Sequence, residues 1–539
     1  MPPAPEENNS QEDKKDIENI EDNPVSPVEQ PSPPPSSKRS RVIKWLVAIA
    51  AVALIAVAAF LVIGQPDKKS EPEQAQKKDI PLLRIGYTSG PLNSFYPGGY
   101  SYTSNFLEVN FQTFEGLVRY EEKTKLVPAL ATGWSNPDSS TWVFSIRPDV
   151  KFHTGRTMTA DDVKASLEAA KSNPDLDLYS STIKSVETTG SDKVTITTDG
   201  TDPILLNKLN YLFIFDTKSD KTDDPINGTG PYVLKSGTEP EEAKISLTAY
   251  DDYYQGRPST RELELSWYED QQVAVDDFNN GKLDITGFLD TGFVEKLNKY
   301  EPYLPTPLGT RFIRIQTANE NSPLAKKEFR QGLQYLLDKP ALIKVGGAGL
   351  PASQIVPQDI PGHDSSIKEP GKDVTKAKAL FTAAGYPNGA TLSLISSSSP
   401  DPVKEIQRQF AEGGIKIESE DIPDFDAFLA KSESGEVDLT YQAYVSDFLD
   451  GTDFLSYLTK DDSYKNTEID KLVEESNQAL DSADRLVKLK QASRLAADDV
   501  PVLPLSYLQD TFAMNNTYVL QQDITSSLSG SYFWKTYQK

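Results

Sequence analysis

The hydrophobic pattern of the chain begins with an uninterrupted apolar run, WLVAIAAVALIAVAAFLVI, from Trp45 to Ile63. In a helix with a rise of about 1.5 Å per residue, a run of this length just crosses a hydrocarbon core of about 30 Å. The positive-inside rule places the preceding residues in the cytoplasm, because basic residues crowd that side of the run, namely Lys38, Arg39, Arg41 and Lys44. The pattern therefore predicts a transmembrane signal anchor over 42–63 and an extracytoplasmic domain after it.

The polar segments on either side of this run differ from it sharply. Residues 1–41 are rich in Glu, Asp, Pro, Ser and Asn, a composition that cannot bury enough surface to fold. We therefore expect a disordered cytoplasmic tail over 1–41 and a polar linker over 64–80. The alternative to an anchor is a cleaved signal peptide. An anchor is favoured because about forty residues precede the apolar core and the polar sequence IGQPDKK ends it.

From Pro81 onward, short alternating patterns indicate a folded domain that mixes strands with helices. In TWVFSIR at 141–147, Trp142, Phe144 and Ile146 alternate with smaller or polar residues, as in a half-buried strand. Comparable patterns predict further strands at 82–88, 193–198, 244–250, 263–268, 283–288 and 500–507.

Helical signals lie between these strands. Thr159 with Asp162 resembles a capping box and predicts a helix over 160–171. Gly385 ends one further predicted helix, and another runs from Pro402 to Gly413. A long helical pair is predicted over 467–498, so that strands and helices together indicate α/β lobes.

Composition excludes some classes of partner. The 539 residues carry a formal net charge of −25, which argues against nucleic acid or an anionic membrane surface as the main ligand. The chain has no cysteine, so it has neither disulfides nor a lipid-modified Cys, and the predicted helix is the only evident membrane attachment.

No motif of an enzyme or a metal site stands out. The two histidines, His153 and His363, lie far apart in the sequence, and His153 falls in a predicted turn. The chain has no G-x-S-x-G elbow, P-loop or HExxH motif. Paired carboxylates are common in so acidic a chain and fit solvation better than acid–base catalysis. We therefore expect a protein that is not an enzyme and needs no cofactor or bound metal.

The most specific motifs of the chain lie in residues 109–170. They are P-x-L-A-x-x-W at 128–134, W-x-F-x-I-R at 142–147 and V-K-F-H-x-G-x-x-x-T-A-x-D-V at 150–163. These motifs resemble those of the extracytoplasmic solute-binding proteins of ABC transporters, in the large peptide- and nickel-binding family (family 5). Further segments resemble the family in the same order, namely GTGPY at 228–232, AYDDYYQGRPST at 249–260, FRQGLQYLLDKPALIKV at 329–345, KAKALFTAAGYPNG at 376–389 and VPVLPLSY at 500–507.

This resemblance implies a two-lobed periplasmic-binding-protein-like fold, the Venus flytrap of the large peptide-binding class. Lobe I is expected to be discontinuous, over 81–310 with 508–539, and lobe II to cover 311–507. Two neighbouring strands crossing between such lobes act as a hinge, and closure buries a ligand between them.

The resemblance also suggests a ligand-binding segment, YQAYVSDFLDGTDFL at 441–455. Asp447 falls on the aspartate that pairs with the ligand's α-ammonium in peptide-binding members, and Tyr444 falls on an aromatic residue of a side-chain pocket. Phe448 stands where the family has tyrosine. The alternative for Asp447 is a turn cap at the surface. A cleft-lining loop is expected over 98–105, with candidate ligand contacts at Tyr100, Ser101, Tyr102 and Thr103, although aromatic packing accounts equally well for the two tyrosines.

The resemblance implies a protein that captures peptides and delivers them to an ABC permease and its ATPase subunits, and the predicted helix over 42–63 would anchor it in the membrane. No basic residue for a peptide C-terminus is identified from the sequence. Two alternatives remain: the same fold with a nickel chelate, haem or oligosaccharide as ligand, or a surface scaffold that takes no part in transport.

Overall fold

The computed structural model describes residues 78–88, 104–121, 124–219, 227–236, 244–289, 291–298, 300–303, 305–346, 349–509, 511–520 and 533–539. The predicted tail and transmembrane anchor lie outside these residues, as does the predicted linker except for its last three positions. No helix in the described part of the chain is long and apolar enough to cross a membrane.

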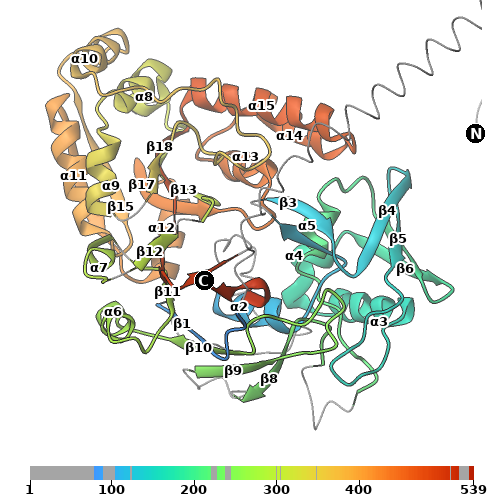
Figure 1. Ribbon diagram of the computed structural model, residues 1–539. Coiled ribbons are helices and arrows are strands. Elements are labelled where there is room, and N and C mark those ends of the chain that lie inside the picture. The colour runs from blue at the N-terminus through green and yellow to red at the C-terminus, as the bar shows by residue number, and fades with distance from the viewer. Residues whose placement is uncertain are drawn as a thin grey trace, which may run out of the picture. The chain divides into compact units, whose positions relative to one another are not determined.

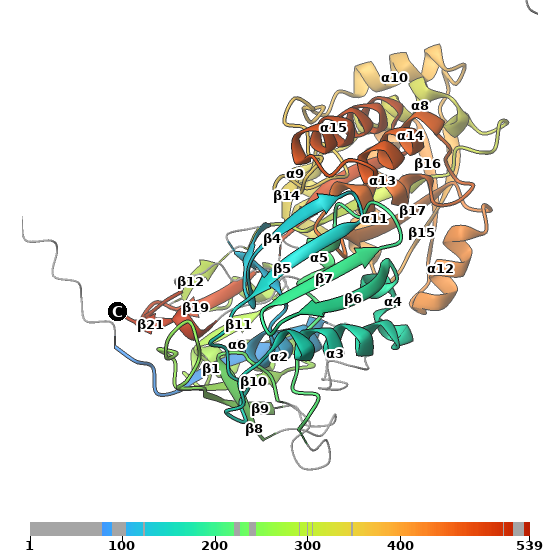
Figure 2. The same ribbon diagram turned by 90° about the vertical axis from the view of Figure 1, so that its right-hand side faces the viewer.

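The first large sheet has seven strands among the described residues, in the order β12-β19-β11-β1-β10-β9-β8 (Figures 1 and 2). The strands are β1 (Leu83–Tyr87), β8 (Tyr232–Ser236), β9 (Lys244–Ala249), β10 (Glu262–Trp267), β11 (Ile285–Gly287), β12 (Tyr300–Tyr303) and β19 (Phe512–Asn515). β1 pairs in parallel with both β10 and β11, and Leu83, Ile85 and Tyr87 are fully buried. This central position explains the apolar composition of the strand.

Short helices accompany this sheet. α2 (Ser104–Thr113) contacts β8, and α6 (Gln271–Asn279) contacts β11 and α7 (Thr291–Val294). The chain ends with η3 (Phe533–Lys535) and a small ladder between β20 (Tyr518–Val519) and β21 (Tyr537–Gln538).

An antiparallel sheet of four described strands follows the order β4-β5-β7-β6 (Figure 2). Its strands are β4 (Ala131–Asp138), β5 (Thr141–Ile146), β6 (Ile183–Thr189) and β7 (Lys193–Thr198). On β5, Trp142, Phe144 and Ile146 are buried, as their alternation predicted. α3 (Ala160–Lys171) packs on β6 and β7, and the Asp162 carboxylate accepts the backbone N–H of Thr159 at 2.9 Å, as the capping box predicted. Nearby lie the β2–β3 hairpin (Val118–Glu121 and Lys125–Pro128), η1 (Pro174–Leu176), α4 (Asp177–Ser180) and α5 (Leu205–Leu209).

The second large sheet has six described strands in the order β14-β18-β13-β17-β15-β16. They are β13 (Gly309–Ile315), β14 (Gly349–Pro351), β15 (Ala390–Ser396), β16 (Ile415–Asp421), β17 (Leu439–Val445) and β18 (Val502–Leu508). β15 pairs in parallel with β16 along its length but with β17 only at Leu439 and Thr440. The rest of β17 therefore has no strand partner on that side among the described residues.

The helices of this part of the chain are η2 (Pro323–Ala325), α8 (Lys327–Gln334), α9 (Lys339–Gly346), α10 (Val374–Ala383), α11 (Pro400–Glu412), α12 (Phe425–Glu433), α13 (Gly451–Thr459), α14 (Thr467–Asn477) and α15 (Ser482–Asp499). A core between the sheet and α8, α10 and α11 contains Phe329, Phe381 and Phe410. α11 begins two residues before the predicted Pro402, and the left-handed residue after it is Gly414 (φ 86°) rather than Gly413.

The chain passes between the two large sheets at two neighbouring places. β12 belongs to the first sheet and β13 to the second, whereas β18 belongs to the second and β19 to the first. β13 and β18 are antiparallel neighbours, with Gly309 opposite Leu508, so the two connections lie side by side. This exchange of strands motivates the division into two lobes, whose predicted boundaries stay a proposal.

Candidate functional site

The segment after β17 is a tight loop fixed by its own side chains. The Asp453 carboxylate accepts two hydrogen bonds, from the Ser446 hydroxyl at 2.6 Å and from the backbone N–H of Phe448 at 3.0 Å. The backbone N–H of Asp450 donates to the Ser446 hydroxyl oxygen at 3.1 Å. Leu449 has a left-handed backbone (φ 52°), which is uncommon for a leucine and is held by these contacts. Asp447 therefore sits on a backbone that is held on both sides.

A buried ion pair between Asp450 and Arg485 connects this loop to α15. Asp450 caps α13 by accepting the backbone N–H of Thr452 at 2.9 Å. The same carboxylate accepts two hydrogen bonds from the Arg485 guanidinium, both at 2.6 Å. The two side chains are only 3% and 9% exposed, so the pair joins the loop to α15 inside the protein.

The carboxylate of Asp447 differs from those of Asp450 and Asp453 in its contacts. In the part of the chain that the structure describes, its half-buried carboxylate makes no hydrogen bond and no ion pair. Burial raises the pKa of the Asp447 carboxyl above its usual value. The helix α13 that follows is capped by Asp450.

Asp447 lines a cavity of about 480 Å³, which we call the Asp447 cavity. One wall comes from β17, its loop and α13, including Tyr444, Phe448 and Asp453, with Asn477 of α14 beside it. The opposite wall comes from residues far earlier in the sequence, namely Leu178, Thr182, Thr201, Asp202, Pro203, Ile204 and Lys208. The predicted residues Tyr444, Asp447 and Phe448 are thus brought together, whereas Tyr100, Ser101, Tyr102 and Thr103 lie outside the described residues.

The two predicted aromatic residues have different environments. Tyr444 is half-buried and stacks on Tyr457 of α13, with ring centroids 4.6 Å apart. Phe448 is buried against Tyr179, and its carbonyl accepts hydrogen bonds from the Tyr120 hydroxyl at 3.1 Å and the Asn207 amide at 2.7 Å. Tyr444 therefore presents a ring to the cavity, while Phe448 also joins the two walls.

Sequence reasoning missed several residues of this cavity. Lys208 is buried and pairs with Asp202 at 2.7 Å, and Lys460 pairs with Glu433 at 2.9 Å. Both cations in the described lining therefore already have a carboxylate partner. Asp453 lies within 441–455, the segment that the resemblance had indicated, so the sequence did contain a signal for it. The wall that contains Lys208 carried no such signal, because its contacts with Phe448 arise only from the tertiary fold.

The Asp453 carboxyl is expected to make stability depend on pH. Burial, with the carboxylates of Asp450 and Asp447 nearby, raises its pKa from 3.8 to about 7. Because the folded protein then binds more protons than the unfolded chain between pH 4 and 7, the free energy of unfolding falls as the pH rises through this window. Urea denaturation at pH 5 and pH 8 is expected to show a smaller pH-dependent loss for Asp453→Asn than for the wild type, by on the order of 2 kcal/mol. An equal loss in both proteins would contradict this assignment.

A second cavity of about 440 Å³ adjoins the first, and we call it the Arg311 cavity. The two share Tyr444, Tyr457 and Lys460. The second is bordered by Gln442 and Ala443 on the part of β17 that β15 leaves unpaired, and by Phe425 and Phe428 of α12. The two cavities together therefore follow this edge of β17 to the loop of Asp447.

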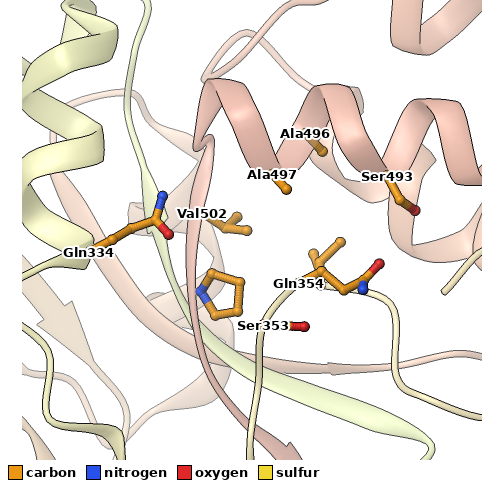
Figure 3. A pocket seen from close by; sticks show the side chains of 9 residues that line it. Gln334, Ser353, Gln354, Ser493, Ala496, Ala497 and Val502 are labelled. Atoms are coloured by element: carbon orange, nitrogen blue, oxygen red, sulfur yellow. The ribbon is translucent and has the colours of Figure 1, made fainter. Parts of the chain in front are cut away.

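Other hollows in the described part of the chain differ from these two in size and lining. One of about 20 Å³, lined by Gln354, Ser493 and Val502 among others, has room for about one water molecule (Figure 3). Another of about 730 Å³ is lined by Leu449, Asp450 and Arg485 among others, and it shares Pro203 with the Asp447 cavity. In the described part of the chain, no group of three or more His, Cys, Asp or Glu residues could hold a metal ion.

Comparison with known proteins identifies a family model and several relatives that are similar to this chain. Residues 125–466 match the model of the bacterial extracellular solute-binding proteins, family 5, middle region. The nickel-binding protein NikA of Staphylococcus aureus is 26% identical over 75% of this chain and 84% of its own length. The heme-binding protein A of Haemophilus influenzae is 26% identical over 74% and 82%, respectively. The di/tripeptide-binding protein 1 of Pseudomonas aeruginosa is 25% identical over 78% and 88%.

Solved structures show the same fold at lower identity. The periplasmic murein tripeptide-binding protein MppA, in its unliganded open form, has a TM-score of 0.75 at 19% identity and covers 86% of this chain and 98% of its own. The oligopeptide-binding protein AppA of Bacillus subtilis, in complex with a nonapeptide, has a TM-score of 0.64 at 19% identity, over 86% and 100%. The family model covers more than half of the chain, and the fold agrees with it. The chain therefore belongs to family 5 of the bacterial extracellular solute-binding proteins, the substrate-binding components of ABC importers.

Proposed function

We propose that this protein captures peptides in the Asp447 and Arg311 cavities and delivers them to an ABC permease and its ATPase subunits. The observation that carries the proposal is the Asp447 carboxylate, which is half-buried, faces a cavity and has no partner among the described residues. A buried charge without a partner is costly, and the cost is offset when a ligand brings the opposite charge. The α-ammonium of a peptide supplies such a charge together with three N–H donors.

The unpaired edge of β17 supplies a way to hold the peptide backbone. Beyond Thr440, β17 pairs with β13 on one side only. An extended peptide adds to such an edge through main-chain hydrogen bonds, which need no particular side chain. With its ammonium at Asp447, the peptide would run back along Tyr444 to Gln442, antiparallel to β17. The rings of Tyr444 and Tyr457 then lie beside its first residues.

We infer that the structure represents the open state of a two-lobed protein, with lobes at 81–310 with 508–539 and at 311–507. The higher TM-score to the unliganded open form of MppA than to the peptide complex of AppA supports this inference, since the sequence identities are equal. The adjacent strands β13 and β18 lie next to the two connections where the proposed lobes meet. Closure about these connections would bury the ligand.

The proposal is tested with pools of random tri- to hexapeptides, prepared with free and with acetylated N-termini, against the purified full-length protein. Free-amine peptides are expected to be retained and identified by native mass spectrometry, whereas the acetylated pool is expected to bind poorly. Retention of both pools to the same extent, or of neither, would contradict the peptide proposal.

Two of the relatives are named for binding nickel and heme, so a ligand other than a peptide is the second candidate. Nickel chelates, haem and oligosaccharides are alternatives with the same fold. Among its described residues, the lining of the two cavities contains no His, Cys or Met, the side chains that bind soft or borderline metals directly. This composition favours a peptide, and a ligand retained through purification would decide between the classes. A surface scaffold without transport would retain none.

We also propose that residues 42–63 anchor the protein in the membrane, with the binding domain outside the cell. The apolar run and the basic residues before it support this proposal. Deletion of 1–63 is expected to move the protein from the membrane fraction to the soluble fraction.

A further inference from the structure

The backbone of Phe448 is hydrogen-bonded to parts of the chain that are far apart in the sequence. Its N–H donates to the Asp453 carboxylate of α13 at 3.0 Å, within the proposed lobe II. Its carbonyl oxygen accepts from the Tyr120 hydroxyl of β2 at 3.1 Å and from the Asn207 amide of α5 at 2.7 Å, both in the proposed lobe I. The Asn207 amide also donates to the Tyr120 hydroxyl oxygen at 3.0 Å, so the two donors fix each other. One peptide unit is therefore bound by both proposed lobes.

The side chain of Phe448 packs on the same part of the chain as its carbonyl. Its ring contacts Tyr179 edge to face, with centroids 5.7 Å apart, and the Lys208 ammonium lies 5.7 Å from its centroid. Four residues earlier, Tyr444 stacks instead on Tyr457 of α13. The partners of this segment therefore change from the proposed lobe II to the proposed lobe I between Tyr444 and Phe448.

This contact continues the row of strand ends at which the chain passes between the two large sheets. Gly309 of β13 pairs with Leu508 of β18 on one side and with Val445 of β17 on the other. Neighbouring strands lie about 4.8 Å apart, so the two chain connections alone give a joint that is only about one strand spacing wide. Phe448 follows Val445 by three residues and widens the joint on the side of β17.

Two cavities border this contact. The Asp447 cavity is lined by Phe448 and Lys208, whereas the cavity of about 730 Å³ is lined by Leu449 and Asn207, the next residue of the loop and the preceding residue of α5. The two cavities share Pro203, and both are lined by residues of the two proposed lobes. Because open space borders the contact in two places, the lobes are free to turn about it without breaking it.

We propose that the hydrogen bonds from Tyr120 and Asn207 to the Phe448 carbonyl form a pivot, which limits the motion of the two lobes to closure about one axis. Two bodies joined at a narrow place twist as well as bend, and a wider joint resists the twist. Asp447 precedes the pivot by one residue, so a rotation about this axis displaces its carboxylate little. The inference rests on the two-lobed closure in the proposed function, and it makes Tyr120 and Asn207 positioning residues for Asp447.

The test measures the distance between the two lobes in the unliganded full-length protein. Because the chain has no cysteine, Glu187→Cys and Asp401→Cys together give two unique sites for spin labels. The two side chains are 69% and 73% exposed, on β6 and α11, which lie on opposite sides of Figure 1. Pulsed electron paramagnetic resonance then gives the distribution of distances between the labels, and a single narrow distribution is expected.

Loss of the donors is expected to broaden this distribution. Tyr120→Phe and Asn207→Leu each remove one donor to the Phe448 carbonyl, and the double variant, which removes both, is expected to broaden it most. Tyr232→Phe is the matched control. It also removes a buried tyrosine hydroxyl that donates to a backbone carbonyl, that of Thr260 at 3.2 Å, but within the proposed lobe I, and it is expected to leave the width unchanged.

Equal widths in the substituted and unsubstituted proteins would overturn the pivot, and so would an equal broadening by Tyr232→Phe. The single variants each keep one hydrogen bond, so the comparison does not depend on the folding of the double variant.

A second arm of the experiment separates this inference from the proposed function. The free-amine pool of tri- to hexapeptides is expected to shift the distance distribution of the protein that keeps Tyr120 and Asn207, because ligand favours the closed state. An unshifted distribution would contradict the proposed capture of peptides, while the widths without ligand still decide on the pivot.

Discussion

Replacing Asp447 by asparagine is expected to abolish most of the affinity for a free-amine peptide, with a loss of at least about 30-fold. The loss corresponds to about 2 kcal/mol or more, the cost of removing one member of a buried charge pair. Asparagine has nearly the same shape as aspartate and still accepts a hydrogen bond, so the charge is the main property removed. Calorimetry with a peptide from the free-amine pool measures the effect.

The same substitution is expected to stabilise the unliganded protein. The pKa of Asp447 is raised by burial, so ionisation at neutral pH costs folding free energy, and this cost disappears in Asp447→Asn. Thermal unfolding without ligand at pH 7 is therefore expected to occur at a higher temperature in the variant. A gain in stability joined to a loss of binding is typical of a binding residue rather than a structural one.

Asp462→Asn is the matched control for this experiment. Asp462 lies shortly after α13, its side chain is 100% exposed, and it is absent from the lining of both cavities. Its substitution is expected to leave affinity and stability unchanged. A loss of stability in Asp447→Asn, with wild-type affinity, would reject the assignment of Asp447 as the ammonium contact.

The second large effect is expected at the ion pair beneath the loop. Asp450→Ala leaves the Arg485 guanidinium buried without its carboxylate and removes the cap of α13. Breaking one side of a buried pair costs about 3–5 kcal/mol of folding free energy. Urea denaturation is therefore expected to show a loss of this size, and the affinity for peptides is expected to fall because the Asp447 loop loses its support.

A double substitution tests whether the unpaired charge is the cause. In Asp450→Ala with Arg485→Met, no buried charge is left over, and the loss of stability is expected to be smaller than in Asp450→Ala alone. Asp401→Ala is the control, since its pair with Lys404 is 73% and 72% exposed and is expected to contribute less than about 1 kcal/mol. Equal effects for Asp450→Ala and Asp401→Ala would contradict the importance of the buried pair.

The sequence predicted much of the fold because the relevant signals are local. Alternation along 141–147 placed β5, the Thr159–Asp162 pair placed the start of α3, and the helical pair over 467–498 became α14 and α15. The order of motifs gave the family, which the family model confirms. Errors stayed at element ends, as at Pro400, where two prolines close together are both compatible with a first turn.

The candidate site could be predicted from the sequence only in part. The sequence pointed to Tyr444, Asp447 and Phe448 through a resemblance, and it left a turn cap at the surface as the alternative for Asp447. Only the structure assigns the cap of α13 to Asp450 and shows the Asp447 carboxylate without a partner among the described residues. Which of three neighbouring aspartates meets a helix N-terminus depends on how the loop folds.

What the sequence by itself determined is therefore the apolar run at 45–63, the positions of several strands and helices, and the segment that carries Asp447. Only the tertiary structure decided which residues surround that segment in the Asp447 cavity and that Arg311 lines the neighbouring cavity. Lys208 and Lys460, which are far apart in the sequence, both line the Asp447 cavity. Arg311 of β13 lies opposite Ala443 of β17. Periodicity reports which face of an element is buried, but it carries no information about which distant element covers that face.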